Sequence, residues 1–185
     1  GTGEIGKHAG SVVHDCVVIK RHVRVLPEFF HIMEHFRGGD VTVVDLQRHA
    51  FHDDLLQAPG NVGVQCGWQR RAAVDMLSRL SGPRIFVAGD MAETGGENVE
   101  SYHREIGQYA REHGVDRFLA VGEAMKSAVE AFGAGARHFA SRDELTAAAM
   151  ETAKTPCTML VKASNSMGLQ HVVRDIVSEL GITDK

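Results

Sequence analysis

Two loops of this sequence place charged side chains beside glycine or serine, each directly after a short apolar run. The first loop, residues 89–96, has the sequence Gly-Asp-Met-Ala-Glu-Thr-Gly-Gly. Its glycines let the backbone approach a ligand closely. The carboxylates of Asp90 and Glu93 are suited to accept hydrogen bonds from an ammonium group or to orient a neighbouring domain. The alternative is a solvated acidic turn before a helix, where negative charge is favourable in any case.

The second loop, residues 162–166, has the sequence Lys-Ala-Ser-Asn-Ser. It follows a predicted strand and opens a predicted helix, so free backbone N–H groups near Lys162 indicate an anion site for a carboxylate or a phosphate. The alternative is an ordinary helix start, with Ser164 or Ser166 as the N-cap and Lys162 exposed.

Other chemical motifs are weaker. Residues 1–8 approach the phosphate-loop pattern G-x-x-x-x-G-K-[ST], but His8 stands where a hydroxyl must hold Mg²⁺. Histidines recur at helical spacing within residues 31–52, but without the further ligands that a zinc site needs. The sequence has no G-x-S-x-G elbow and no G-x-G-x-x-G after a predicted strand, so neither a serine hydrolase nor a dinucleotide site is indicated.

Composition narrows the class of protein. The chain has 185 residues, which suits one domain or one domain with part of another. A net charge of -4, without a Lys/Arg cluster, argues against nucleic-acid binding. No apolar run is long enough to span a membrane, and the first residues lack a signal-peptide core. With three scattered cysteines, we expect a reducing, cytoplasmic location.

Regular elements that would position the two loops begin at residue 72. Apolar runs predict buried strands, and apolar residues at helical spacing predict helices between them. The predicted strands are 84–88, 117–121, 137–140 and 157–161. The predicted helices are 72–80, one from 99 that Gly114 ends, 124–132, one opened by a capping box of Ser141 and Glu144, and 172–180.

This alternation predicts an open, doubly wound, mostly parallel Rossmann-like α/β sheet that is covered on both faces. Residues 41–45 predict a further strand of the same sheet. Residues 46–71 read as an irregular loop. Ligands of such sheets lie beyond the carboxyl ends of the strands. Both charged loops are therefore expected at the functional edge.

The same loops carry a resemblance to a known family. Residues 89–95 resemble the G-D-M-x-E-L-G segment of the UDP-N-acetylmuramoyl-tripeptide–D-alanyl-D-alanine ligases, which belong to the Mur ligases. Residues 160–166 resemble the family's L-V-K-G-S-R-S segment, and residues 116–122 resemble its D-R-x-L-x-V-G strand. His103 follows at the family's spacing. The resemblance covers about 100 residues, from 82 to 181, and points to the family's C-terminal domain.

The resemblance implies a three-domain, ATP-dependent peptide ligase of peptidoglycan precursor synthesis. Its central domain holds most of the ATP and Mg²⁺ contacts, and its C-terminal domain closes over the central one and helps to bind D-alanyl-D-alanine. The UDP-muramoyl-tripeptide would be bound through domains that match nothing here. The implied substrate contacts of this chain are Asp90, Glu93, Lys162, Ser164 and Asn165, with Asp45 as a cofactor contact. No catalytic residue or metal ligand is implied, and we expect no activity from this chain alone.

The sequence also departs from the family pattern. Thr94 replaces Leu, Ala163 replaces Gly, and Asn165 replaces Arg, which removes a charged, two-pronged donor. Residues 46–71 match nothing in the family, which should read D-D-x-Y-N-A-N-P after the strand at 41–45. The chain is either a fragment with a divergent or frame-shifted segment, or a rearranged protein that kept the closing domain.

Two domain assignments follow. Residues 1–40 are predicted to be a weakly structured remnant that resembles the end of the family's central domain. Residues 41–185 are predicted to form the Rossmann-like domain, with an atypical insertion at 46–71. The alternatives to a ligase domain are a stand-alone Rossmann-like module for a nucleotide or small anion, and an inactive fragment.

Overall fold

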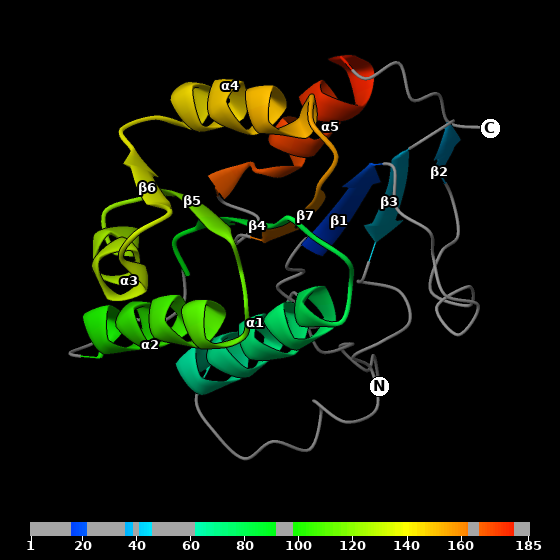
Figure 1. Ribbon diagram of the computed structural model, residues 1–185. Helices are drawn as coiled ribbons and strands as arrows, with labels where there is room; N and C mark the ends of the chain where they lie inside the picture. Colours follow the sequence, from blue (N-terminus) through cyan, green and yellow to red (C-terminus); the bar gives the residue numbers. More distant parts are fainter. Residues whose placement is uncertain are drawn as a thin grey trace, which may run out of the picture.

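The computed structural model describes residues 16–21, 36–38, 41–45, 62–91, 98–162 and 167–179. Strands and helices follow each other along these ranges (Figure 1). The elements are β1 (Cys16–Arg21), β2 (Phe36–Gly38), β3 (Val41–Asp45), α1 (Val62–Ser78), β4 (Arg84–Gly89), α2 (Val99–Glu112), β5 (Arg117–Val121), α3 (Met125–Phe132), β6 (Ala136–Phe139), α4 (Arg142–Ala153), β7 (Thr158–Lys162) and α5 (Gln170–Glu179).

The described strands form one sheet in the order β2-β3-β1-β7-β4-β5-β6. Strands β7, β4, β5 and β6 are parallel to each other, whereas β1 is antiparallel to both β7 and β3, and β2 is antiparallel to β3. The predicted α/β class is confirmed, and so is the strand at 41–45. Neither β1 nor β2 was predicted, and the domain division at residue 40 stays a prediction.

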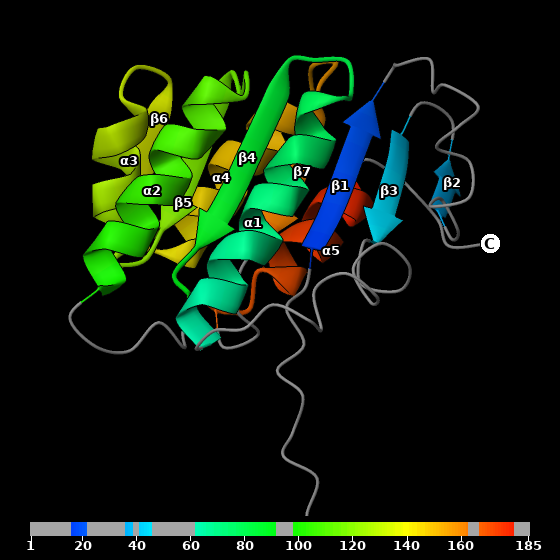
Figure 2. The ribbon, with the colours of Figure 1, turned by 90° about the horizontal axis from the view of Figure 1, so that it is seen from below.

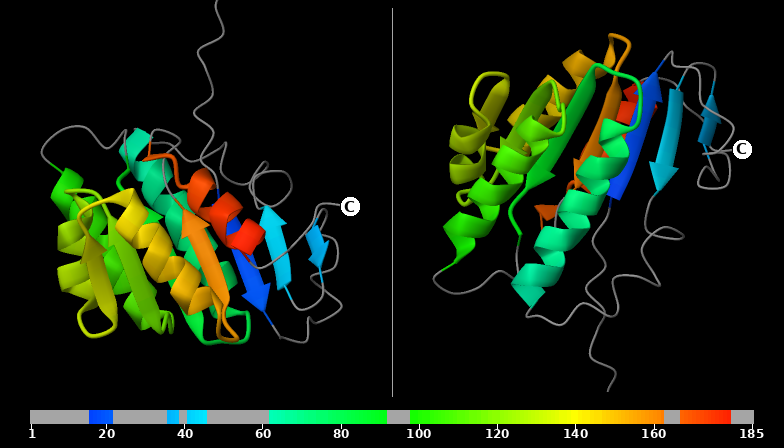
Figure 3. Two further views of the ribbon diagram at one scale, coloured as in Figure 1. Left: turned by 90° about the horizontal axis from the view of Figure 1, so that it is seen from above. Right: turned by 60° about the horizontal axis from the view of Figure 1, so that its bottom comes forward.

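Helices cover both faces of the parallel half of the sheet. Helices α1, α2 and α3 pack on one face, and α4 and α5 pack on the other (Figures 2 and 3). Because successive side chains of a strand point to opposite faces, Phe86 and Phe118 enter the first layer while Val87 and Leu119 enter the second. Both faces are buried, which explains why these strands are continuous apolar runs.

Helix α1 corrects the prediction for residues 46–71. It begins at Val62, so residues 62–71 are helical and not part of an irregular loop. Two glycines and scattered charges hide the helix in the sequence, because they lower helix propensity and leave no clear apolar stripe. Farther along the same helix Val74 and Leu77 are completely buried against the sheet. Such tertiary packing outweighs weak local propensity.

A polar cluster joins α1 to α2 on the outer surface. The Tyr109 hydroxyl donates to Asp75 Oδ1 at 2.6 Å, and the His113 ring stacks on the Tyr109 ring with centroids 3.8 Å apart. The Arg71 guanidinium lies 5.1 Å from the centre of the Tyr109 ring and forms an ion pair with Glu105. Burial, followed by the hydrogen bond to Asp75, raises the pKa of Tyr109 to about 12. The cluster therefore favours the neutral phenol.

A capping box of two hydrogen bonds lies at the start of α4. Ser141 Oγ accepts from the Glu144 N–H at 3.2 Å, and Glu144 Oε2 accepts from the Ala140 N–H at 3.1 Å. The predicted capping box at the start of α4 is thus confirmed, although the glutamate reaches one residue farther back than the usual partner.

None of the helices in the described ranges has the length and apolar character needed to cross a membrane.

Candidate functional site

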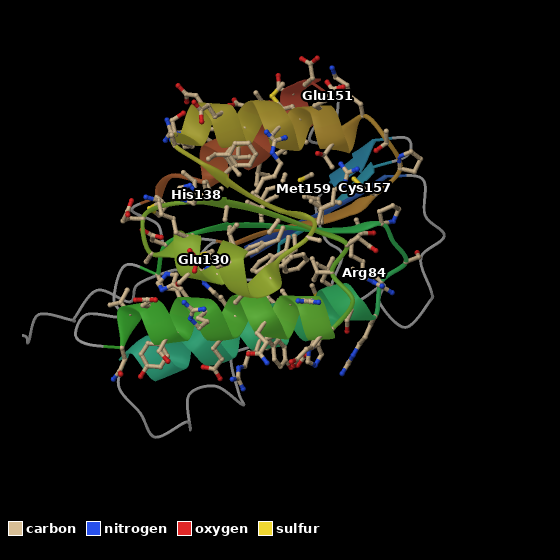
Figure 4. All side chains as sticks on the ribbon, turned by 60° about the vertical axis from the view of Figure 1, so that its left-hand side comes forward. Arg84, Glu130, His138, Glu151, Cys157 and Met159 are labelled. Carbon is tan, nitrogen blue, oxygen red and sulfur yellow. The ribbon has the colours of Figure 1, made fainter. Side chains whose placement is uncertain are left out.

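The carboxyl ends of the four parallel strands meet at one edge of the sheet, as both charged loops require. Asp90 directly follows β4, Gly122 directly follows β5, and Lys162 ends β7. His138 of β6 lies at this edge, and Figure 4 shows it at the opposite end of the sheet from Arg84, the first residue of β4. The candidate site is built from residues of neighbouring strands at this edge.

The Asp90 carboxylate caps the N-terminus of α3. Asp90 Oδ1 accepts from the Met125 N–H at 3.0 Å, and Oδ2 accepts from the Ala124 N–H at 3.4 Å. Ala124 is the N-cap residue of α3 and offers no side-chain cap of its own. The first N–H groups of a helix lack helical partners, so the Asp90 carboxylate, which follows the neighbouring strand β4, stabilises them. The Asp90 side chain keeps 25% of its surface exposed.

Gly122 lies against this carboxylate. Its φ angle is +113°, and a Cβ added there would stand 2.3 Å from Asp90 Cγ and 2.3 Å from Oδ1. Both the backbone conformation and the contact therefore require glycine. On the other side, His138 Nε2 donates to the Gly122 carbonyl at 2.7 Å. The turn after β5 is thus held by Asp90 from the neighbouring β4 and by His138 from the neighbouring β6.

His103 of α2 is completely buried beside Asp90. Its Nδ1 lies 2.7 Å from the Val99 carbonyl, and its Nε2 lies 3.1 Å from the Met91 backbone nitrogen. A carbonyl only accepts and a backbone N–H only donates, so the ring is neutral and carries its proton on Nδ1. Burial lowers the pKa of His103, partly offset by the bond to Val99. Asp90 Oδ1 lies 4.0 Å from Nε2.

Two buried cations lie near the same edge. Arg70 of α1 is 2% exposed and its Nη2 donates to the Gly89 carbonyl at 2.7 Å. Lys162 is 5% exposed and lies opposite Ala88 in the sheet register. The alternative of an exposed lysine at a helix start is therefore wrong. Lysine is seldom buried unless it is paired, so its place here indicates an electrostatic role.

Of the remaining predicted site residues, the structure places one, Asp45. Glu93, Ser164 and Asn165 lie outside the described residues. Asp45 ends β3, and Val17 of β1 is the register partner of both Asp45 and Val161. Because β1 is antiparallel to β3 and to β7, Asp45 lies at the same edge as Lys162. The structure therefore brings Asp45, Asp90 and Lys162 to one edge, and their binding roles stay predictions.

Sequence reasoning missed Arg70 and His138, and it gave His103 no role. Arg70 was overlooked because its stretch was read as a loop. His103 had a local signal, since it lies four residues after Val99 at the start of an amphipathic helix. The described ranges contain no group of three or more His, Cys, Asp or Glu side chains placed to hold a metal ion.

The fold and the polar residues at the carboxyl edge of its parallel strands define an α/β domain. Ligands of such a domain bind beyond the carboxyl ends of the strands. Residues 69–165, just over half of the chain, match the family model described as Mur ligase, glutamate ligase domain. The chain therefore belongs to the Mur ligase family, as the resemblance predicted.

Individual relatives agree with this assignment. The UDP-N-acetylmuramoyl-tripeptide–D-alanyl-D-alanine ligase of Escherichia coli (strain K12) is 38% identical over 105 residues, which are 56% of this chain and 23% of that protein. The ligase of the same name from Buchnera aphidicola subsp. Acyrthosiphon pisum is 33% identical over 110 residues, which are 58% of this chain and 24% of that protein. This chain spans about a quarter of the length of these relatives.

A solved structure shares the fold. The crystal structure I of MurF from Acinetobacter baumannii superposes with a TM-score of 0.55 and 22% identity, over 60% of this chain and 25% of that chain. At this identity the likeness shows the fold alone.

Proposed function

We propose that this chain supplies the C-terminal domain of an ATP-dependent ligase that adds D-alanyl-D-alanine to UDP-N-acetylmuramoyl-tripeptide. One observation carries the proposal. The region that matches the family model, residues 69–165, includes Asp90 and Lys162, which lie at the carboxyl edge of the parallel strands. The relatives that match at 33–38% identity are ligases of this name. The proposal places the reaction in the cytoplasm, where ATP is available for peptidoglycan precursor synthesis.

The chemistry of the dipeptide suits the charges at this edge. D-alanyl-D-alanine carries an ammonium group at one end and a carboxylate at the other. In the proposal, the carboxylates of Asp90 and Glu93 accept from the ammonium group. In the same proposal, Lys162, Ser164 and Asn165 are the contacts of the dipeptide carboxylate. None of these contact residues is proposed as a nucleophile or general base, so in the proposal the domain contributes positioning and charge stabilisation.

ATP and Mg²⁺ belong to the proposal through the rest of the ligase. When bound, ATP supplies the phosphoryl group that activates the precursor's terminal carboxylate for attack by the dipeptide amine. As the resemblance implies, Mg²⁺ and most contacts to ATP are assigned to the central domain of the ligase. Asp45, which ends β3 at the same edge, is the proposed contact of this chain with ATP.

Hydrogen exchange of the full chain tests the site. We expect D-alanyl-D-alanine, added with ATP, Mg²⁺ and the N-terminal two-domain part of the E. coli relative, to protect residues 89–97 and 162–167. The C-terminal turn of α2, residues 109–112, serves as the internal control, because it lies toward the amino ends of the strands, where Arg84 Nη1 donates to the Gly114 carbonyl. Protection by ATP alone, with no effect of the dipeptide, would instead favour a nucleotide-binding module.

A matched pair of lysine substitutions tests the charge. Lys162→Met keeps a long side chain in the buried position and removes only the ammonium group. We expect it to weaken dipeptide binding by about tenfold, as loss of one charge-assisted hydrogen bond would. Lys154→Met is the control, because Lys154 is exposed just after α4, before β7 begins, and donates to Glu151 Oε2 at 2.7 Å. Equal effects of the two substitutions would count against a dipeptide contact at Lys162.

A further inference from the structure

His103 has a bonding pattern that the proposed substrate contacts do not use. The residue lies on α2, its side chain is completely buried, and both of its ring nitrogens are bonded to backbone atoms. One bond joins it to Val99, the first residue of its own helix. The other joins it to Met91, which follows Asp90 at the end of β4. A single rigid ring therefore ties the start of α2 to the end of β4.

The bond to Met91 acts on Asp90 through the peptide plane. The Met91 nitrogen belongs to the planar Asp90–Met91 peptide, so fixing that nitrogen fixes the plane that leaves Asp90. The Asp90 carboxylate is fixed separately by the Ala124 and Met125 N–H groups at the start of α3. The backbone and the side chain of Asp90 are thus held from two different helices.

We propose that His103 is a positioning residue of the dipeptide site: as a neutral, Nδ1-protonated imidazole, it holds the Asp90–Met91 peptide and so aims the Asp90 carboxylate. The inference rests on the proposed function, because it assigns the aim of Asp90 to the ammonium group of the dipeptide. His103 itself touches no substrate. Its effect passes through the Met91 N–H.

The surroundings of the ring favour this single bonding state. Two charged groups act on His103: Arg70 of α1, which lowers the pKa of the ring, and Asp90, which follows β4 and raises this pKa. A charged imidazolium would carry a proton on Nε2 and would then point one donor at another donor, the Met91 N–H. The neutral ring is therefore the form that holds the peptide in place.

Two substitutions separate the two bonds of the ring. His103→Gln places an amide oxygen near the position of Nε2, so it keeps an acceptor for the Met91 N–H. His103→Asn places an amide nitrogen near the position of Nδ1, so it keeps a donor for the Val99 carbonyl but leaves Met91 without its acceptor. The two variants lose one bond each, and a purely structural role predicts similar effects for both.

His113 offers a matched control on the same helix. Its Nδ1 lies 2.8 Å from the Tyr109 carbonyl, which repeats the bond of His103 to the carbonyl four residues earlier. It lies directly after α2 on the outer surface, where its ring stacks on Tyr109, far along the helix from Asp90. His113→Asn therefore changes the same kind of local bond without touching the end of β4.

The experiment is an NMR study of the full chain. With ATP, Mg²⁺ and the N-terminal two-domain part of the E. coli relative present, it follows the amide exchange of Met91 and the shifts that added D-alanyl-D-alanine causes, for the wild type and the three variants. We expect His103→Asn to speed Met91 exchange and to raise the dipeptide Kd, each by about tenfold, as loss of one buried hydrogen bond would. His103→Gln and His113→Asn should stay within about threefold of the wild type in both readings.

Three results decide the matter. If His103→Asn and His103→Gln raise the Kd equally, the ring acts only in stability and the positioning role is overturned. If His103→Asn leaves Met91 exchange unchanged, the inferred bond is overturned directly. If the wild-type chain does not respond to the dipeptide while Met91 behaves as expected, the proposed function fails and the positioning role falls with it.

Discussion

The carboxylate of Asp90 fills the space in which any side chain at Gly122 would begin. A Cβ at Gly122 would stand 2.3 Å from Asp90 Cγ. Non-bonded carbon atoms do not approach so closely, so Asp90 or the turn would have to move. This contact joins the end of β4 to the turn after β5, and the same carboxylate caps α3. Asp90 therefore shapes the candidate site even before any ligand is considered.

Gly122→Ala should destabilise the fold strongly. The substitution places a Cβ at a positive φ and drives it into Asp90, so we expect a loss of about 2–4 kcal/mol in the free energy of unfolding. Urea unfolding followed by circular dichroism measures this loss.

Gly133→Ala separates the two costs in this prediction. Gly133 also has a positive φ, +78°, but an added Cβ there would lie 3.6 Å from Arg111 Nη1, an ordinary contact distance. Only the backbone cost remains there, which is about 1 kcal/mol or slightly more. If Gly122→Ala costs no more than Gly133→Ala, the contact with Asp90 has no energetic weight.

Stability should fall as the pH is lowered below about 6.5, in part because of His103. Burial lowers the pKa of folded His103 below its ordinary value of 6.5, so between the two pKa values the unfolded chain binds more protons. The stabilising contribution is present above pH 6.5 and is lost as the pH falls toward the folded pKa. Urea unfolding at about pH 7.5 and about pH 5 measures the change.

His103→Gln isolates this contribution from that of the other histidines. Glutamine does not titrate, so the difference in unfolding free energy between the wild type and this variant should shrink as the pH falls. A difference that stays constant between the two pH values would mean that His103 titrates normally and is not held neutral by burial.

Tyr109 should lose its phenolic proton only at a pH above the ordinary range of tyrosine. The pKa of about 12 means that its phenol stays neutral in the folded protein above the ordinary value of 10.0. Its contribution to stability is therefore fully present below pH 10 and is lost as the pH rises toward 12. The chain has two tyrosines, so absorbance titration of the phenolates resolves the step. Tyr109→Phe should remove the late step, and Asp75→Ala should move it toward lower pH. Absence of any phenolate step above pH 10 would contradict the raised pKa of Tyr109.

The sequence was most informative where local pattern and burial agree. The strand at 117–121 was predicted with its observed bounds, and the strands at 84–88 and 157–161 were displaced by one residue at most. Continuous apolar runs identify such strands because both of their faces are buried. The capping box of Ser141 and Glu144 is equally local, since its bonds span only a few residues.

The parts that were missed depend on distant partners. Helix α1 packs on the sheet through Val74 and Leu77, but its first half has no amphipathic pattern of its own. The contacts of Asp90 with Gly122 and Met125 join residues more than thirty positions apart, and spacing along the chain gives no sign of them. The sequence therefore placed Asp90 at the right edge without showing that it caps a neighbouring helix.

The most direct test of the proposed function is a chimera. The C-terminal region of the E. coli relative that aligns with this chain is replaced by the corresponding region of this chain, and joining of D-alanyl-D-alanine to UDP-N-acetylmuramoyl-tripeptide is followed by mass spectrometry with ATP and Mg²⁺. The account predicts dipeptide-dependent product, reduced when Lys162 is changed to Met and retained when Lys154 is changed to Met. A chimera that folds, as judged by circular dichroism and a cooperative unfolding transition, but forms no product would contradict the assignment of this chain as the closing domain of such a ligase.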